Sequence, residues 1–223
     1  MQAGAEALLR FDLGIYRRIS PEMVVDRVKE ADIVIFAGGI SPSLEGEEMY
    51  SVNSPGFAGG DRTSIELPQV QRDILKALKK AGKKVVFVNC SGSAVALVPE
   101  MESCDAILQA WYPGQSGGLA VADVLFGDFN PSGKLPVTFY KNTDQLPDFE
   151  DYSMKNRTYR YMTEAPLFPF GYGLSYTTFD ISKGRLNKKA ISAGQDLNFK
   201  VNVKNTGKYD GAEVIQVYVR KVD

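Results

Sequence analysis

Hydrophobic and polar residues follow two different periods along the first 140 positions of the chain. Short continuous apolar runs are typical of parallel strands that are buried on both faces. Strands are therefore predicted over 32–39, 83–90, 104–111 and 133–139. Apolar residues at helical spacing lie between these runs and before the first of them. Helices are predicted over 21–31, 67–82 and 116–128.

Two of these helices carry signals at their ends. Ser20 is an N-cap residue, and Pro21 takes the first helical position, where an N–H would have no partner anyway. Gly82, the last residue of the segment 67–82, is a C-cap candidate for the second helix. The apolar stripe of that helix consists of Val70, Ile74, Leu75 and Leu78.

Strands and helices alternate over 31–140, and residues 1–30 form the lead-in to them. This order predicts an open, mostly parallel α/β sheet with helices on both faces, a flavodoxin-like α/β sandwich. In such sheets the ligand crevice lies beyond the carboxyl ends of the strands. Residues 41–50, 89–93 and 111–118 follow strand ends and should meet there.

The amino-acid composition and the hydrophobic pattern of the chain change at residue 141. Residues 141–176 form a connector rich in Pro and Tyr, and the segments 196–207 and 212–219 then alternate apolar and polar residues like half-buried antiparallel strands. Residues 177–223 therefore predict part of a β-sandwich, since a complete one has about seven strands in about 100 residues. We expect its unpaired strand edges to pair with a second copy, giving a homodimer, or with the main domain.

Composition narrows the function classes. Lys and Arg number 26 against 27 Asp and Glu, so no net field attracts nucleic acid or an acidic membrane surface. The apolar runs are too short to cross a membrane, and no targeting signal is recognisable, so the localisation stays unknown. The sequence contains no His, which excludes Ser-His or Cys-His nucleophiles and the usual zinc sites. No metal or cofactor is expected, and Cys90 and Cys104 are interpreted as small buried apolar residues.

The stretch "SPSLEGEEMY" places Glu45, Glu47 and Glu48 directly behind a buried strand. Crowded carboxylates repel one another, which raises the pKa of any that is shielded from water and suits it to general acid catalysis. The alternative is a solvated acidic turn. Further on, "GGDRTSIELP" adds Asp61 and Arg62, which could organise this acidic loop or form a structural salt bridge.

Trp111 and Tyr112 follow the third predicted strand into a Pro-Gly turn. They could form a platform on which a sugar stacks, or an aromatic plug between sheet and helix. The sequence alone leaves both interpretations open.

An ordered series of motifs decides between these alternatives. "EGEEM", "GGDRTSIELPQVQ", "AWYPGQSGGLAVADVLFGDFNPSGKLPVTF", "RTYRYM" and "PLFPFGYGLSYTTF" together resemble glycoside hydrolase family 3, the β-glucosidases and β-xylosidases, over residues 31–223. The resemblance implies a retaining exo-glycosidase in which an N-terminal barrel domain carries an Asp nucleophile. The α/β domain of 31–140 would supply the Glu acid/base, and 177–223 would begin a fibronectin type III-like domain.

The family pattern also implies roles for single residues. Its Gly-Glu-Gly-Tyr-like motif matches Gly46 and Glu47 best, which makes Glu47 the expected acid/base, and the sequence departs from the motif at Glu48 and Met49. Glu45 and Glu48 therefore stay alternatives. Asp61 and Arg62 match the family's "DR", which implies support of the loop.

The expected partners are a β-linked glucoside or xyloside and the barrel domain, without which the chain should be inactive. The competing hypothesis is a non-catalytic carbohydrate-binding or interaction module of flavodoxin-like fold.

Overall fold

The computed structural model describes residues 19–46 and 53–220. The chain forms two compact units, the first from residues 1–117 and 138–169, and the second from residues 118–137 and 170–223. The domain boundaries drawn from sequence texture, at 30, 140 and 176, stay predictions. Glu47 and Glu48 lie outside the described residues.

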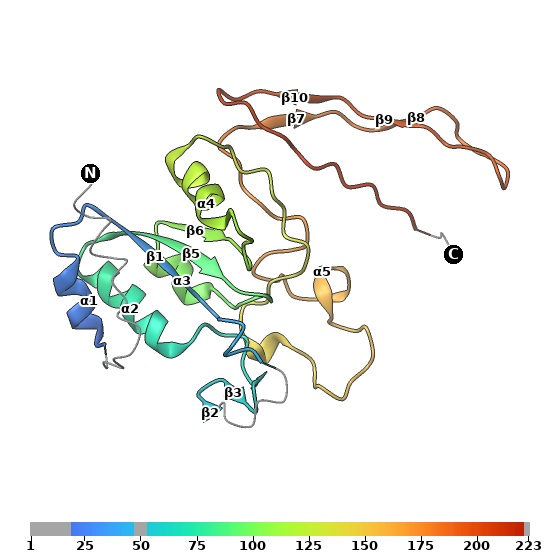
Figure 1. Cartoon of the computed structure of the whole chain (residues 1–223). Helices are drawn as coiled ribbons and strands as arrows, with labels where there is room; N and C mark the ends of the chain where they lie inside the picture. The colour runs from blue at the N-terminus through green and yellow to red at the C-terminus, as the bar shows by residue number, and fades with distance from the viewer. Residues whose placement is uncertain (1–18, 47–52, 221–223) are drawn as a thin grey trace. The chain divides into compact units, whose positions relative to one another are not determined.

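The first unit contains a parallel sheet, as predicted, and this sheet has three strands rather than the four expected. It consists of β1 (Ile33–Gly39), β5 (Lys84–Cys90) and β6 (Ala106–Gln109), in the order β1-β5-β6 (Figure 1). Val34 pairs with Val85 and Phe36 with Phe87, so these side chains share one face of the sheet. The molecule is thus a mixed α/β protein whose parallel sheet comes from three of the four predicted strands.

Burial differs between the centre and the edge of this sheet. The central strand β5 is buried along most of its length, with Val85, Phe87 and Val88 in the core. At the edge strand β1, however, Ile33 is 56% exposed and Ile35 is 38% exposed. The expected burial of β1 on both faces is therefore wrong, because an apolar run does not reveal whether its strand lies in the centre or at the edge.

Helix α1 begins, and helix α2 ends, close to where the sequence signals indicate. Helix α1 (Pro21–Arg27) is capped by the Ser20 hydroxyl, which accepts a hydrogen bond of 3.3 Å from Met23 N, and it ends before the predicted residue 31. Helix α2 (Gln69–Lys80) packs against α1 and β5, and Gly82 follows it with a φ of +75°. Three residues of its stripe are buried, Ile74, Leu75 and Leu78, whereas Val70 is exposed. The short helix α3 (Val98–Ser103) was not predicted.

Helix α2 also fixes the carboxyl end of β1. Gln71 accepts a hydrogen bond of 2.8 Å from Gly39 N and donates one of 2.7 Å to Gly39 O. A Cβ at Gly38 would lie 2.4 Å from Gln71 Oε1, and one at Gly39 would lie 1.9 Å from Cys90 O. The close approach of α2 and β5 therefore requires Gly at both positions. It also fixes the point from which residues 40–46 leave the sheet.

The "GGDR" motif lies in a small antiparallel sheet formed by β2 (Asn53–Ser54), β3 (Phe57–Ala58) and β4 (Asp61–Arg62). Gly59 and Gly60 connect β3 to β4 with φ values of +61° and +91°. Two successive positive φ angles are the signature of the type I′ turn that suits a two-residue hairpin. This turn directs Arg62 back toward the parallel sheet.

The predicted strand over 133–139 does not form. Leu135 exchanges backbone hydrogen bonds with Gly171 and Tyr172, and Phe139 does so with Leu167 and Phe168. A continuous ladder between the two segments is prevented because Pro136 and Pro169 have no N–H to donate. The connector also contains the 3₁₀-helix η1 (Thr143–Gln145) and the short helix α5 (Thr158–Tyr161).

The second unit contains most of α4 (Gly117–Phe126) and two short antiparallel ladders. In these ladders β7 (Phe179–Ile181) pairs with β10 (Val203–Asn205), and β8 (Arg185–Leu186) pairs with β9 (Phe199–Lys200). The predicted strand over 212–219 is absent, and Val217 and Val219 are 64% and 90% exposed. No strand of the described residues forms a ladder with residues 212–219, although these residues alternate between apolar and polar. No helix among the described residues is long and apolar enough to span a membrane.

Candidate active site

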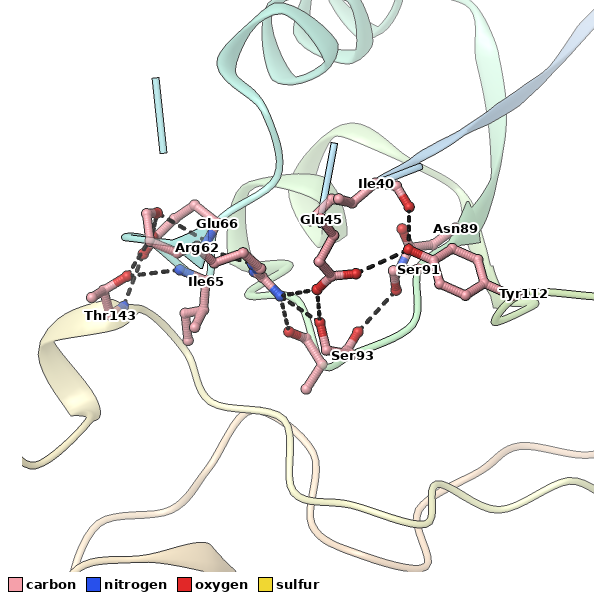
Figure 2. Close-up of polar contacts among 12 residues, drawn as sticks. Ile40, Glu45, Arg62, Ile65, Glu66, Asn89, Ser91, Ser93, Tyr112 and Thr143 are labelled. Atoms are coloured by element: carbon pink, nitrogen blue, oxygen red, sulfur yellow. Dashed lines mark hydrogen bonds and ion pairs between the residues drawn. The ribbon is translucent and has the colours of Figure 1, made fainter. Parts of the chain in front are cut away.

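Three segments that follow the parallel strands meet at the carboxyl edge of the sheet, as the topology predicts. They contribute Glu45 after β1, Ser93 after β5 and Tyr112 after β6, and Arg62 joins them from β4 (Figure 2). We call these four residues the Glu45 network. All four belong to the first unit.

Both carboxylate oxygens of Glu45 have partners. Oε1 accepts a hydrogen bond of 2.5 Å from the Ser93 hydroxyl and lies 3.6 Å from Arg62 Nη1. Oε2 lies 2.9 Å from the Tyr112 hydroxyl. With the Glu45 side chain 20% exposed, this carboxylate is held from three sides rather than projecting freely into solvent.

Arg62 binds the same turn after β5. Its Nη1 donates to Ser93 Oγ at 2.7 Å and to Ala94 O at 3.1 Å, and its Nε donates to Ser64 O at 3.2 Å. Burial lowers the pKa of Arg62, and the negative charge of Glu45 opposes this shift. Among the described residues Nη2 is buried without a hydrogen-bond partner. The guanidinium therefore joins β4 to the turn at Ser93 and Ala94.

Tyr112 and Trp111 take different directions. The Tyr112 hydroxyl lies 2.8 Å from Ile40 O and 2.9 Å from Glu45 Oε2, so two acceptors share its one proton. Burial and the interaction with Glu45 raise the pKa of Tyr112, which keeps the hydroxyl a donor. The Trp111 ring packs edge-on against Phe139, with centroids 6.0 Å apart. Its φ of 58° is unusual for a residue other than Gly, and this packing helps to hold it.

A second layer of buried polar groups supports the turn after β5. Asn89 Nδ2 donates to Gln109 Oε1 at 2.6 Å, and Gln109 Nε2 donates to Ser91 Oγ at 3.2 Å. The Ser91 hydroxyl in turn donates to Ser93 O at 2.9 Å. Asn89 and Ser91 are fully buried, so these bonds fix the position of Ser93 relative to the sheet.

The candidate residues are thus only partly brought together. Arg62 contacts Glu45, whereas Asp61 is exposed and no described side-chain contact joins it to that carboxylate. Ser93 was not anticipated as a partner of Glu45, although "NCSGS" was expected at this edge. A Ser in the turn after a central strand was the signal that could have identified it.

Glu66 is a further carboxylate that the sequence did not single out. Its oxygens accept hydrogen bonds from Thr143 N at 2.9 Å and from the Thr143 hydroxyl at 2.5 Å, and a third comes from Ser64. Burial alone would raise the pKa of Glu66, but these hydrogen bonds outweigh it and lower the pKa to about 2. Glu66 therefore ties the segment after β4 to the connector.

The lowered pKa of Glu66 predicts a pH-dependent contribution to stability. This contribution is complete above the unfolded pKa of 4.5 and is lost as the pH falls toward 2. We expect Glu66→Gln to lower the free energy of unfolding by about 1–2 kcal/mol at pH 7, after allowance for solvent screening. Urea unfolding at pH 7, 4.5 and 3 would show the deficit shrinking below pH 4.5, with the exposed Glu102→Gln as a control. A variant as stable as the parent at pH 7 would contradict this account.

Comparisons with known proteins identify the family of this domain. Residues 10–176 match the glycosyl hydrolase family 3 C-terminal domain, which accounts for more than half of the chain. The chain belongs to glycosyl hydrolase family 3, as its motifs indicated.

Relatives in this family include enzymes named for two sugars. A xylan 1,4-beta-xylosidase of Xylanibacter ruminicola is 61% identical over 216 residues, which cover 97% of this chain and 25% of that protein. A periplasmic beta-glucosidase of Salmonella typhimurium is 41% identical over 219 residues, covering 91% and 27% of the two chains. The chain thus spans about a quarter of the length of these relatives.

Solved structures match the fold as well. A β-glucosidase of Erythrobacter marinus superposes with a TM-score of 0.69 at 37% identity, covering 83% of this chain and 25% of that one. A β-glucosidase of Listeria innocua in complex with glucose gives a TM-score of 0.66 at 30% identity, covering 86% and 27%.

Proposed function

We propose that this chain supplies the acid/base half of the active site in a retaining exo-acting β-glycosidase. The observation that carries the proposal is the Glu45 network, which fixes the Glu45 carboxylate at the carboxyl edge of the sheet in a family 3 domain. A binding module has no need of a carboxylate fixed in this way.

The substrate we propose is a terminal β-linked xylose or glucose. A relative named a xylosidase is 61% identical, whereas one named a glucosidase is 41% identical, which favours the xyloside. The glucose and laminaribiose complexes of the Listeria innocua enzyme support a carbohydrate substrate, although they belong to that protein.

The mechanism we propose divides two carboxylates between two domains. An Asp of the barrel domain attacks the sugar and forms a glycosyl-enzyme, while Glu47 of this chain protonates the leaving oxygen. Glu47 then removes a proton from the water that releases the sugar. The two carboxyl groups of a retaining pair lie about 5–5.5 Å apart, so the acidic segment must be held accurately against the barrel.

The wider architecture follows from the same proposal. In the complete enzyme, the parallel sheet would belong to a flavodoxin-like sandwich with helices on both faces, and residues 177–223 to a fibronectin type III-like domain. The exposed Val217 and Val219 would be covered by further strands, from the longer chain or from a second copy in a homodimer. A monomer in which this segment stays freely exchanging would argue against such pairing.

A chimera tests the function directly. This chain replaces the corresponding quarter of the Xylanibacter ruminicola enzyme, and the chimera and the chain alone are assayed on nitrophenyl β-xyloside and β-glucoside. We expect the chimera to hydrolyse the xyloside faster than the glucoside, and the chain alone to be silent. Turnover by the chain alone would refute the division between domains. A folded but inactive chimera would favour the non-catalytic module instead.

A further inference from the structure

A loop of the connector presents three large apolar side chains to solvent. Phe149 is 92% exposed, Tyr152 is 90% exposed and Met154 is 51% exposed. They belong to residues 148–157, which run between η1 and α5 in the first unit (Figure 1) and which we call the aromatic loop. Single exposed apolar residues are common on protein surfaces, whereas a group of them marks an interaction site. The internal structure of the loop indicates which kind of site this is.

The backbone of the aromatic loop is held by the side chain of Arg157. Its Nε donates a hydrogen bond of 3.0 Å to Ser153 O, and its Nη2 donates to Asp148 O at 3.2 Å and to Asp151 O. Hydrogen bonds from an ionised donor are stronger than those between neutral groups. The loop is therefore fixed before any partner arrives, which reduces the entropy cost of binding one.

Two carboxylates add to this internal bonding. Asp148 Oδ1 accepts a hydrogen bond of 2.9 Å from Glu150 N, and Asp151 Oδ1 accepts one of 2.8 Å from Ser153 N, which lowers the pKa of Asp151. A small-molecule site needs polar groups that converge on the ligand, whereas these carboxylates and the Arg157 guanidinium bond to the loop itself. Phe, Tyr and Met are the types enriched in the cores of protein interfaces, so the exposed side chains favour a protein partner.

The chain enters the aromatic loop beside the candidate active site. Thr143 lies five positions before the loop, and its hydroxyl accepts a hydrogen bond of 3.1 Å from Ile65 N. Its backbone N–H donates to Glu66 at 2.9 Å. Ile65 and Glu66 follow Arg62, which belongs to the Glu45 network.

The chain leaves the aromatic loop beside the same site. Tyr159 N donates a hydrogen bond of 3.0 Å to Thr138 Oγ1. The next residue after Thr138 is Phe139, which packs against Trp111. Trp111 directly precedes Tyr112 of the Glu45 network. Both ends of the loop are therefore anchored at the edge of the sheet that carries the network.

We propose that the aromatic loop is a docking element which binds the barrel domain of the complete enzyme, with Phe149 and Tyr152 buried in the contact. The chain spans about a quarter of the length of its relatives, so most of the protein that could cover the loop lies outside this domain. In the proposed function, the edge that carries the Glu45 network faces the barrel, and the loop extends that contact. The identity of the partner rests on the proposed function, whereas the fixed and exposed loop does not.

Oxidative footprinting tests the docking directly. The chain alone and the chimera are exposed to hydroxyl radicals, and the oxidation rate of each side chain is measured by mass spectrometry. We expect Phe149, Tyr152 and Met154 to react about tenfold more slowly in the chimera, because a docked interface excludes water. Met101 of α3 is the matched control, since it is 49% exposed, close to the 51% of Met154, and should react equally in both proteins.

Four outcomes of the footprinting would overturn the proposal. Equal rates in the two proteins would mean that the loop does not dock, and an equal slowing at Met101 would mean general shielding in the larger protein. Protection that grows with the concentration of the chain alone would identify a second copy as the partner. Protection that appears only after addition of xylohexaose would identify a carbohydrate site. A protected loop in an inactive chimera would support the docking and reject the proposed function.

A double variant measures what the docking contributes to activity. Phe149→Ser with Tyr152→Ser should leave the urea-unfolding midpoint of the chain alone unchanged, because both side chains are exposed there. In an active chimera, we expect kcat on nitrophenyl β-xyloside to fall about 10- to 100-fold, since misplacing part of an active site by about 1 Å can cost about 100-fold. Tyr209→Ser changes an exposed Tyr of the second unit and should keep the activity. A double variant as active as the parent would overturn the proposed docking role.

Discussion

In the chimera, Glu47→Gln should lower kcat on phenyl β-xyloside by a factor of about 10²–10⁴. This is the range that general acid–base catalysis contributes in enzymes. The amide has nearly the same shape as the carboxyl group but can neither protonate the leaving oxygen nor accept a proton from water. Breakdown of the glycosyl-enzyme should therefore become the slow step on dinitrophenyl β-xyloside.

Chemical rescue distinguishes this loss from damage to the fold. Azide needs no general base, so it should attack the glycosyl-enzyme of the Glu47→Gln variant and form glycosyl azide. This should restore much of the rate on dinitrophenyl β-xyloside, where breakdown of the glycosyl-enzyme is the slow step. The matched control is Glu48→Gln, which changes the neighbouring carboxylate and should keep most of the activity without any effect of azide. If Glu48→Gln rather than Glu47→Gln shows rescue, the acid/base role belongs to Glu48.

The largest expected effect on stability concerns the ion pair between Arg72 of α2 and Glu100 of α3. Arg72 Nε donates to Glu100 Oε1 at 2.9 Å, and the Glu100 side chain is only 1% exposed. Arg72→Met keeps an unbranched apolar stem but removes the guanidinium, which leaves a buried carboxylate without its cation. We expect the free energy of unfolding at pH 7 to fall by about 3–5 kcal/mol, measured by urea unfolding.

The pH dependence of this effect has a definite sign. Burial raises the pKa of Glu100, and Arg72 opposes that shift. Without Arg72 the carboxyl group takes up a proton more readily, so the cost of Arg72→Met should be largest at neutral pH and should shrink as the pH falls toward 4.5, the unfolded pKa.

Two further variants test the cause. Lys79→Met removes an exposed ion pair with Asp105, and it should cost less than about 1 kcal/mol. The double variant Arg72→Met with Glu100→Leu replaces both charges by apolar groups and should recover most of the lost stability. A cost for Arg72→Met no larger than that for Lys79→Met, or one independent of pH, would show that the pair is not the cause.

Local patterns predicted the elements that depend on local physics. The parallel strands β1, β5 and β6 follow from short apolar runs, and the N-cap of α1 follows from Ser20 and Pro21. The meeting of three loops at one edge of the sheet follows from topology alone. These features need no knowledge of which side chains touch.

Contacts between distant residues could not be predicted in the same way. Glu66 and Thr143 are 77 positions apart, and nothing in either local sequence indicates the other. Glu100 is a charged residue in a short helix, and its burial depends on Arg72 from a different helix. Likewise, the alternating pattern of 212–219 states a preference for pairing but cannot supply the partner strand.

The order in which the chain builds its two units limits how the domain can be recombined. The first unit takes residues 1–117 and 138–169, and the second takes the stretches between and after them. No single cut therefore separates one unit from the other, and a truncation after residue 176 would still leave 118–137 without most of its own unit. An exchange of this domain between related enzymes must therefore transfer both units together, even when only the acidic stretch of residues 41–50 is wanted.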